Sequence, residues 1–351
     1  MRATMAWLAA LILTITACGS DAEETTTTSS TTTTSTTSPT TTNAPTTTAL
    51  VGDLSPVNGL PVDDSDLLDR RVLAVKIDNH ANARPQSGLQ EAEAVVELRV
   101  EGGLTRFIAL FHTTDSEYLG PIRSARPSDA RVVLPLGASM AISGGQPWVR
   151  SGISALGVSF LTETAPGMFR ISGRRAPHNL YASTIDLRDT ADSRGFPDDG
   201  PDQPWLSFGE MPDDAATADS ARIRFSKVSA ATWEWDGEVY TRTFGSTPSL
   251  FREKDGDTGP ITADTVVVLF GRFYTAGPPP GQGGSAVPAT DTVGTGKAIV
   301  FSEGRVVEGT WSREAGEDPF SLTTLDGEPM MVPPGFLWVS IVPDVGDVTW
   351  N

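Results

Sequence analysis

The only cysteine of this 351-residue chain is Cys18, and this limits how the chain can fold. Without a second thiol, the protein can form neither an intramolecular disulfide nor a metal site built from several thiolates. Its fold must therefore be stabilised by packed hydrophobic cores.

Cys18 also directly follows an apolar N-terminal segment. Arg2 precedes the stretch MAWLAALILTITA, which is too short to span a membrane and ends in small residues. This ending resembles the lipobox of bacterial lipoproteins. The resemblance implies a signal peptide over residues 1–17, cleavage before Cys18 and attachment of lipid (a diacylglycerol, and palmitate as a typical acyl chain) to its sulfur. An ordinary secretory signal that happens to contain a cysteine is the alternative.

A tether of residues 18–50 follows, and residues 23–49 consist almost entirely of Thr and Ser with a few Pro. Such a segment cannot bury enough apolar surface to offset the entropy of ordering, so it is expected to be disordered. A flexible chain of this length spans roughly 30 Å on average. Together, Cys18 and the tether predict a protein anchored in the lipid bilayer at the outer face of the cytoplasmic membrane.

The remaining chain is expected to have an α+β fold in two parts. Residues 51–195 alternate apolar runs with helix-like stretches, which predicts a mixed α/β domain. Strands are expected at 71–78, 92–100, 106–112 and 138–143, and helices at 127–137 and 147–157. Residues 196–220 are rich in Pro, Asp and Gly, which predicts a linker. Residues 221–351 are expected to form a β-rich domain with a hairpin at 231–244 and a long loop at 275–296.

Charge is distributed unevenly along the chain. The formal net charge is −18, yet residues 76–181 contain 11 basic and 9 acidic residues. An arginine-rich stretch in an acidic protein suggests that placed side chains bind an anion. It does not suggest nucleic acid, for which a basic patch and a high isoelectric point are expected.

Five polar stretches stand out in this region: KIDNHANARPQSGL (76–89), VEGGLTRF (100–107), GPIRSARP (120–127), ISGGQPW (142–148) and RRAPHNLY (174–181). With GKAIVFSEGRVVEGTW and MVPPGFLWVSIVP near the C-terminus, they resemble the YerB-like bacterial lipoproteins, a family of unknown function (DUF3048). The resemblance implies an extracytoplasmic lipoprotein with N- and C-terminal domains. It supplies no established reaction.

Arginines beside Gly, Pro or a strand edge are the first candidates for binding, because a guanidinium group matches carboxylate or phosphate. The candidate ligand-binding residues are Arg84, Arg106, Arg123, Arg126, Asn79, His178 and Asn179. Arg174 and Arg175 share the same kind of setting. The alternative is that these arginines brace loops by pairing with Asp78, Glu97 and Glu101.

Three of these polar residues could instead act as catalysts: Asp78, Glu101 and His178. Ser124, between two arginines, lacks an identifiable base. The chain has three histidines, so a histidine-rich metal site is not expected, and no cofactor is predicted. ISGGQPW lacks a nucleotide-binding pattern. The tryptophans are expected mainly in the core rather than stacked on sugars.

The sequence therefore favours a binding or scaffold protein of the cell envelope that holds an anionic wall polymer, a peptide or an envelope protein. The alternative is a hydrolase or transferase acting on cell-wall glycan or peptide. A third hypothesis is that the polar motifs only brace the fold. The sequence leans away from an enzyme but leaves the three open.

Overall fold

The structure is a computed structural model that describes residues 53–351. The expected signal peptide, Cys18 with its expected lipid and the whole Thr- and Ser-rich tether lie outside these residues. Within residues 53–351, no helix is both long and apolar enough to cross a membrane.

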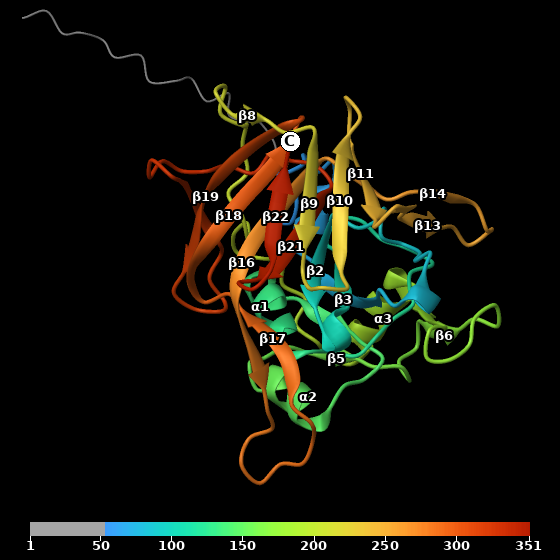
Figure 1. The fold of residues 1–351 in the computed structure, drawn as a ribbon. Helices are drawn as coiled ribbons and strands as arrows, with labels where there is room; N and C mark the ends of the chain where they lie inside the picture. Colours follow the sequence, from blue (N-terminus) through green and yellow to red (C-terminus); the bar gives the residue numbers. More distant parts are fainter. Residues whose placement is uncertain (1–52) are drawn as a thin grey trace, which may run out of the picture. The chain divides into compact units, whose positions relative to one another are not determined.

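A 12-stranded mixed sheet forms the centre of the structure (Figure 1). Ten of its strands form one path, in the order β20 (Ser321–Thr324), β19 (Arg305–Arg313), β18 (Gly294–Ser302), β16 (Thr265–Ala276), β21 (Leu337–Pro343), β2 (Ala94–Arg99), β3 (Thr105–Phe111), β1 (Leu73–Asp78), β4 (Ser139–Ala141) and β5 (Phe160–Leu161). Strand β17 (Val287–Asp291) pairs with β16, and β8 (Ala216–Thr217) pairs with β19.

The two expected sequence regions meet in the middle of this sheet. Strand β2 pairs in parallel with β21, with Val96 opposite Val339. Part of the expected linker also packs into the structure: Trp205 is fully buried, and its indole N–H donates to the carbonyl of Val57 (2.8 Å). The domain boundaries at 51–195, 196–220 and 221–351 thus remain a prediction. In the structure, the central sheet contains strands from both the first and the last of these regions.

A second sheet has six strands, with the path β12 (Thr247–Pro248), β11 (Tyr240–Phe244), β10 (Ala230–Trp235), β9 (Ser220–Arg224) and β22 (Asp347–Trp350), and with β15 (Thr262–Ala263) paired to β11. Two-stranded pairs are formed by β13 (Leu250–Arg252) with β14 (Thr258–Pro260) and by β6 (Met168–Arg170) with β7 (Leu180–Ala182). The predicted hairpin at 231–244 is confirmed as β10 and β11.

Hydrophobic cores lie on both faces of the central sheet, because successive strand residues point to opposite faces. In β1, Ala74 belongs to the core that contains α1 (Ala130–Val133) and α2 (Pro147–Ser154). Its neighbours Leu73 and Val75 belong to the other core, together with residues of the second sheet and of α3 (Thr184–Ser193). A charged residue within β1 must therefore lie inside one of these cores.

The predicted α+β fold is confirmed in part: the central sheet is mixed, but the structure is more β-rich than a balanced α+β fold. The expected helix at 127–137 is broken: α1 has four residues and is followed by a 3₁₀ turn containing Pro135, which lacks the N–H that an α-helix requires. The expected loop at 275–296 contains β17, because Val287 and Ala289 are buried where β17 pairs with the far half of β16. Antiparallel pairing with the preceding strand, across the intervening residues 277–286, outweighed the Pro- and Gly-rich composition.

Candidate functional site

Strand β1 ends at Asp78, as predicted, and the GPIRSARP segment lies directly beside this end. The backbone N–H of Asp78 donates to the carbonyl of Pro121 (2.8 Å), and that of Arg123 donates to the carbonyl of Lys76 (2.7 Å). The fold thus brings together two polar stretches that are about 40 residues apart in the sequence.

The Asp78 carboxylate accepts three hydrogen bonds. Arg123 Nε lies 2.9 Å and His178 Nδ1 2.7 Å from Oδ2, and the backbone N–H of His80 lies 3.2 Å from Oδ1. The rings of His80 and His178 stack with centroids 4.8 Å apart. Burial alone would raise the pKa of Asp78, but Arg123 and these hydrogen bonds outweigh it and lower the pKa. The carboxylate is therefore ionised and well satisfied within the fold.

Arg126 and Arg106 also have partners within the chain. Arg126 Nε donates to Glu101 Oε2 (2.9 Å), and Arg106 Nη1 donates to the carbonyl of Ser124 (3.0 Å). Burial and then the nearby charge of Arg126 lower the pKa of Arg106 to about 10. Burial would raise the pKa of Glu101, but the hydrogen bond from Arg126 and nearby positive charge lower it. These contacts are those expected of arginines that brace loops.

The RRAPHNLY stretch contacts the loop after β1. Arg174 donates to the carbonyls of Ala83 and Pro85. The amide oxygen of Asn179 accepts a hydrogen bond from Arg170 (2.8 Å). Arg175 is exposed, and its side chain has no hydrogen-bond partner among residues 53–351, although its carbonyl accepts from the backbone N–H of His178 (3.0 Å).

Ser124 Oγ lies 3.4 Å from Ser143 Oγ, and none of its hydrogen bonds within the described part of the chain involves a histidine. The structure therefore places no base on this hydroxyl.

Two fully buried ion pairs lie on opposite faces of the central sheet. Lys76 Nζ is 2.6 Å from Asp129 Oδ1, and both side chains are inaccessible to solvent. Burial lowers the pKa of Lys76, although Asp129 acts in the opposite direction. On the other face, Arg242 Nη2 lies 2.9 Å from Glu97 Oε2. The sequence contained a sign that Lys76 and Glu97 are buried charges, because each lies inside an otherwise apolar strand pattern. Arg242 lies in no such pattern.

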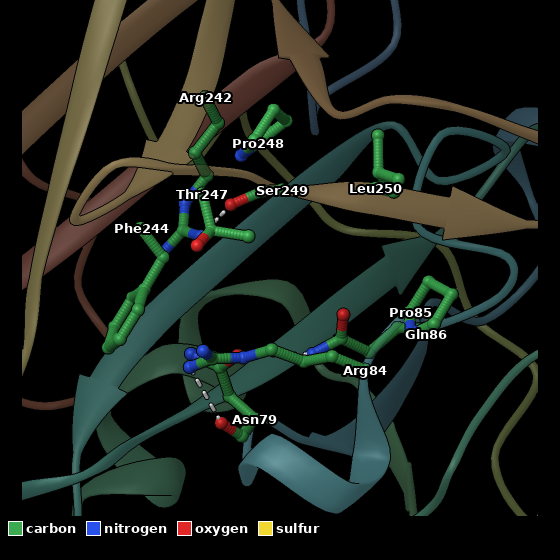
Figure 2. Close-up of a pocket in the computed structure, with 10 residues that line it drawn as sticks. All are labelled: Asn79, Arg84, Pro85, Gln86, Arg242, Phe244, Thr247, Pro248, Ser249 and Leu250. Atoms are coloured by element: carbon green, nitrogen blue, oxygen red, sulfur yellow. Dashed lines mark hydrogen bonds between the residues drawn. The ribbon is translucent and has the colours of Figure 1, made fainter.

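A pocket of about 260 Å³ lies between the loop after β1 and the turn that follows β11 (Figure 2). Its most buried lining residues are Asn79, Gln86 and Arg242, each 2% exposed. Toward solvent it is lined by residues that include Pro248 and Leu250. The pocket thus has a polar floor and a mouth with two apolar side chains beside the polar Thr247, and residues from both halves of the chain form it.

The guanidinium groups of Arg84 and Arg242 approach this pocket from opposite sides (Figure 2). Arg84 donates from Nε to Asn79 Oδ1 (2.9 Å) and from Nη2 to the Asn79 carbonyl (3.0 Å), and its guanidinium carbon lies 3.9 Å from the centre of the Phe244 ring. Burial, followed by the charge of Arg242, lowers the pKa of Arg84. Arg84 Nη1 has no hydrogen-bond partner among residues 53–351, so it remains a free donor beside the pocket.

A chain of hydrogen bonds connects the pocket floor to the buried carboxylate of Glu97. Asn79 Nδ2 donates to Thr105 Oγ1 (2.8 Å), which in turn donates to Glu97 Oε1 (2.6 Å). Glu97 also accepts from Trp338 Nε1 (3.1 Å) and from Arg242. The floor is thus held rigidly, and Glu97 balances one of the two arginine charges.

Two family models match the chain. Residues 57–197 match the N-terminal domain, and residues 221–339 the C-terminal domain, of a protein family of unknown function, DUF3048. The chain belongs to the DUF3048 family. A relative from Bacillus subtilis (strain 168) is named "Putative lipoprotein YerB". The two sequences are 26% identical over 300 residues, which cover 83% of this chain and 86% of the relative. The crystal structure of YerB from Bacillus subtilis has a TM-score of 0.71 at 25% identity and covers 84% of this chain and 99% of its own.

Proposed function

We propose that this DUF3048 protein is a lipid-anchored, extracytoplasmic binding protein that holds an anionic group in the pocket between Arg84 and Arg242. The name of its Bacillus relative supports the lipoprotein part of the proposal. The binding part rests on one observation: two guanidinium groups line a single pocket, and one buried carboxylate, Glu97, balances only one of them. This leaves about one positive charge for a ligand to neutralise.

The other candidate arginines support a different role. Arg123 is paired with Asp78, and Arg126 with Glu101, at 2.9 Å or less. We therefore assign them to bracing of the loops around the end of β1. Arg84 and Asn79 are the sequence candidates that line the pocket.

The hydrolase or transferase alternative draws less support from the geometry. Asp78 and Glu101 each lie against an arginine, which stabilises their charged form and makes them weaker bases. His178 shares the Asp78 oxygen with Arg123 instead of being oriented by a carboxylate of its own.

A titration of the full-length chain in detergent with anionic cell-wall fragments tests the binding proposal. Arg84→Gln should weaken binding by about 1.5–3 kcal/mol, the range for a hydrogen bond to a charged group. Arg222→Gln, the same change at an exposed position of β9, is the matched control and should leave binding unchanged. Equal binding by wild type and Arg84→Gln would refute the assignment of this pocket.

A further inference from the structure

We infer that the pocket recognises the C-terminal end of a peptide: a carboxylate together with the N–H of the last peptide bond. This inference rests on the proposed anion-binding function and specifies its ligand. It is carried by the hydrogen-bonding groups that remain unused around the pocket, by its charge, and by the contrast between floor and mouth.

The amide of Gln86 provides an acceptor. Its Nε2 donates to the carbonyl of Asp78 (3.0 Å) and to Asn79 Oδ1 (3.1 Å). Both partners are oxygens that only accept, so the NH₂ group must face them, and this fixes the orientation of the amide. Gln86 is 2% exposed and lines the pocket, yet its Oε1 has no partner among residues 53–351. A ligand N–H would satisfy this oxygen.

Donors also remain for a carboxylate. Arg84 has a free Nη1, because Asn79 occupies its Nε and Nη2. Ser249 Oγ accepts a hydrogen bond from Arg242 Nη1 (2.8 Å), which leaves its own proton available. The Thr247 hydroxyl also lines the pocket and has no hydrogen-bond partner among residues 53–351, so the pocket offers enough donors for both oxygens of a carboxylate.

The charge and shape of the pocket agree with this ligand. The excess of about one positive charge from Arg84, Arg242 and Glu97 matches a carboxylate monoanion better than a phosphate dianion. A volume of about 260 Å³ lies below the range of about 300–1,000 Å³ typical of pockets that enclose a whole small ligand. The polar floor, together with Pro248 and Leu250 at the mouth, suits a charged chain end that enters first while a small apolar side chain remains near the opening.

Ligand-observed NMR titrations of the full-length chain in detergent test this inference with four probes. N-acetylalanine carries both recognised groups, isobutyrate lacks the amide, N-acetylalaninamide lacks the charge, and methyl phosphate replaces the carboxylate by a dianion. N-acetylalanine should bind most tightly. Loss of the amide should weaken binding about 2- to 12-fold, and loss of the charge about 12- to 150-fold.

The outcomes separate the two proposals. Tighter binding of methyl phosphate, or of glucuronate as a test for an acidic glycan, would overturn the peptide inference and leave the anion-binding function standing. Equal binding of N-acetylalanine and isobutyrate would also overturn it. If none of these anions binds, both proposals fail. The Arg84→Gln variant should lose binding of N-acetylalanine, and the Arg222→Gln variant should retain it. An equal loss in both variants would contradict the assignment of binding to this pocket.

Discussion

Glu97→Gln is expected to make the protein less stable and, at the same time, a better binder of anions. The Glu97 side chain is 1% exposed and that of Arg242 is 2% exposed, with 2.9 Å between their charged atoms. Removing one partner of a buried ion pair leaves the other charge uncompensated, which costs about 3–5 kcal/mol. The new amide also brings NH₂ protons toward donors such as Trp338 Nε1, now 3.1 Å from a carboxylate oxygen.

The effect on binding has the opposite sign. A unit charge about 8 Å from a ligand contributes about 2 kcal/mol at an effective dielectric constant of about 20, which sets an upper limit of roughly 30-fold. Removing the negative charge of Glu97 should therefore tighten the binding of a monoanion by several-fold in the fraction that remains folded. The pocket itself loses no lining residue, because Glu97 lies beneath it.

Urea unfolding and titration with N-acetylalanine measure the two effects separately. Glu308→Gln is the matched control, because its pair with Lys297 lies at the surface, where such pairs contribute about 0–1 kcal/mol. A loss of stability for Glu97→Gln no larger than for Glu308→Gln would refute the energetic argument. Weaker anion binding by folded Glu97→Gln would refute the electrostatic one.

Three further predictions concern the anchor and the bracing contacts. Cys18→Ser should release the protein from the membrane or leave it unprocessed, and equal membrane retention of mature-sized mutant and wild type on fractionation would refute the lipoprotein assignment. Lys76→Met should cost about 3–5 kcal/mol in urea unfolding, whereas the double variant with Asp129→Leu should recover most of it, since no charge is then left buried without a partner. Because the folded pKa of Asp78 is lowered, its contribution to stability should be present above about pH 4 and lost as the pH falls below that value, and Asp78→Asn should flatten this part of the pH profile.

Strands with a strong apolar pattern could be predicted well from the sequence. The strands predicted at 71–78, 92–100, 106–112 and 138–143 all belong to the central sheet as β1, β2, β3 and β4, and Trp233 and Trp311 are buried as expected. Their order in the sheet could not be predicted, because pairing between β2 and β21 joins segments more than 230 residues apart. Apolar periodicity shows which face of a strand is buried, but it carries no information about the neighbouring strand.

The candidate site was predictable to a similar extent. The end of β1 gathers Asp78, Arg123 and His178 from three of the polar stretches, so the sequence identified residues that do converge. It could not indicate whether an arginine would face a carboxylate of its own chain or an open pocket. Arg242 went unnoticed because it lies in an exposed-looking hairpin, and its burial depends on packing against the central sheet.

Both halves of the chain contribute residues to the pocket, which suggests a functional reason for the two-domain architecture of the family. Asn79, Arg84 and Gln86 come from the N-terminal region, and Arg242 and Ser249 come from the C-terminal one. The N-terminal loop alone offers one guanidinium group that Asn79 already engages through two of its nitrogens. The second positive charge is held in place by Glu97, a residue of the N-terminal region, across the interface between the two sheets. Arg242 thus joins the halves through Glu97 and lines the proposed binding site, so a change that separates the two halves should remove both stability and binding.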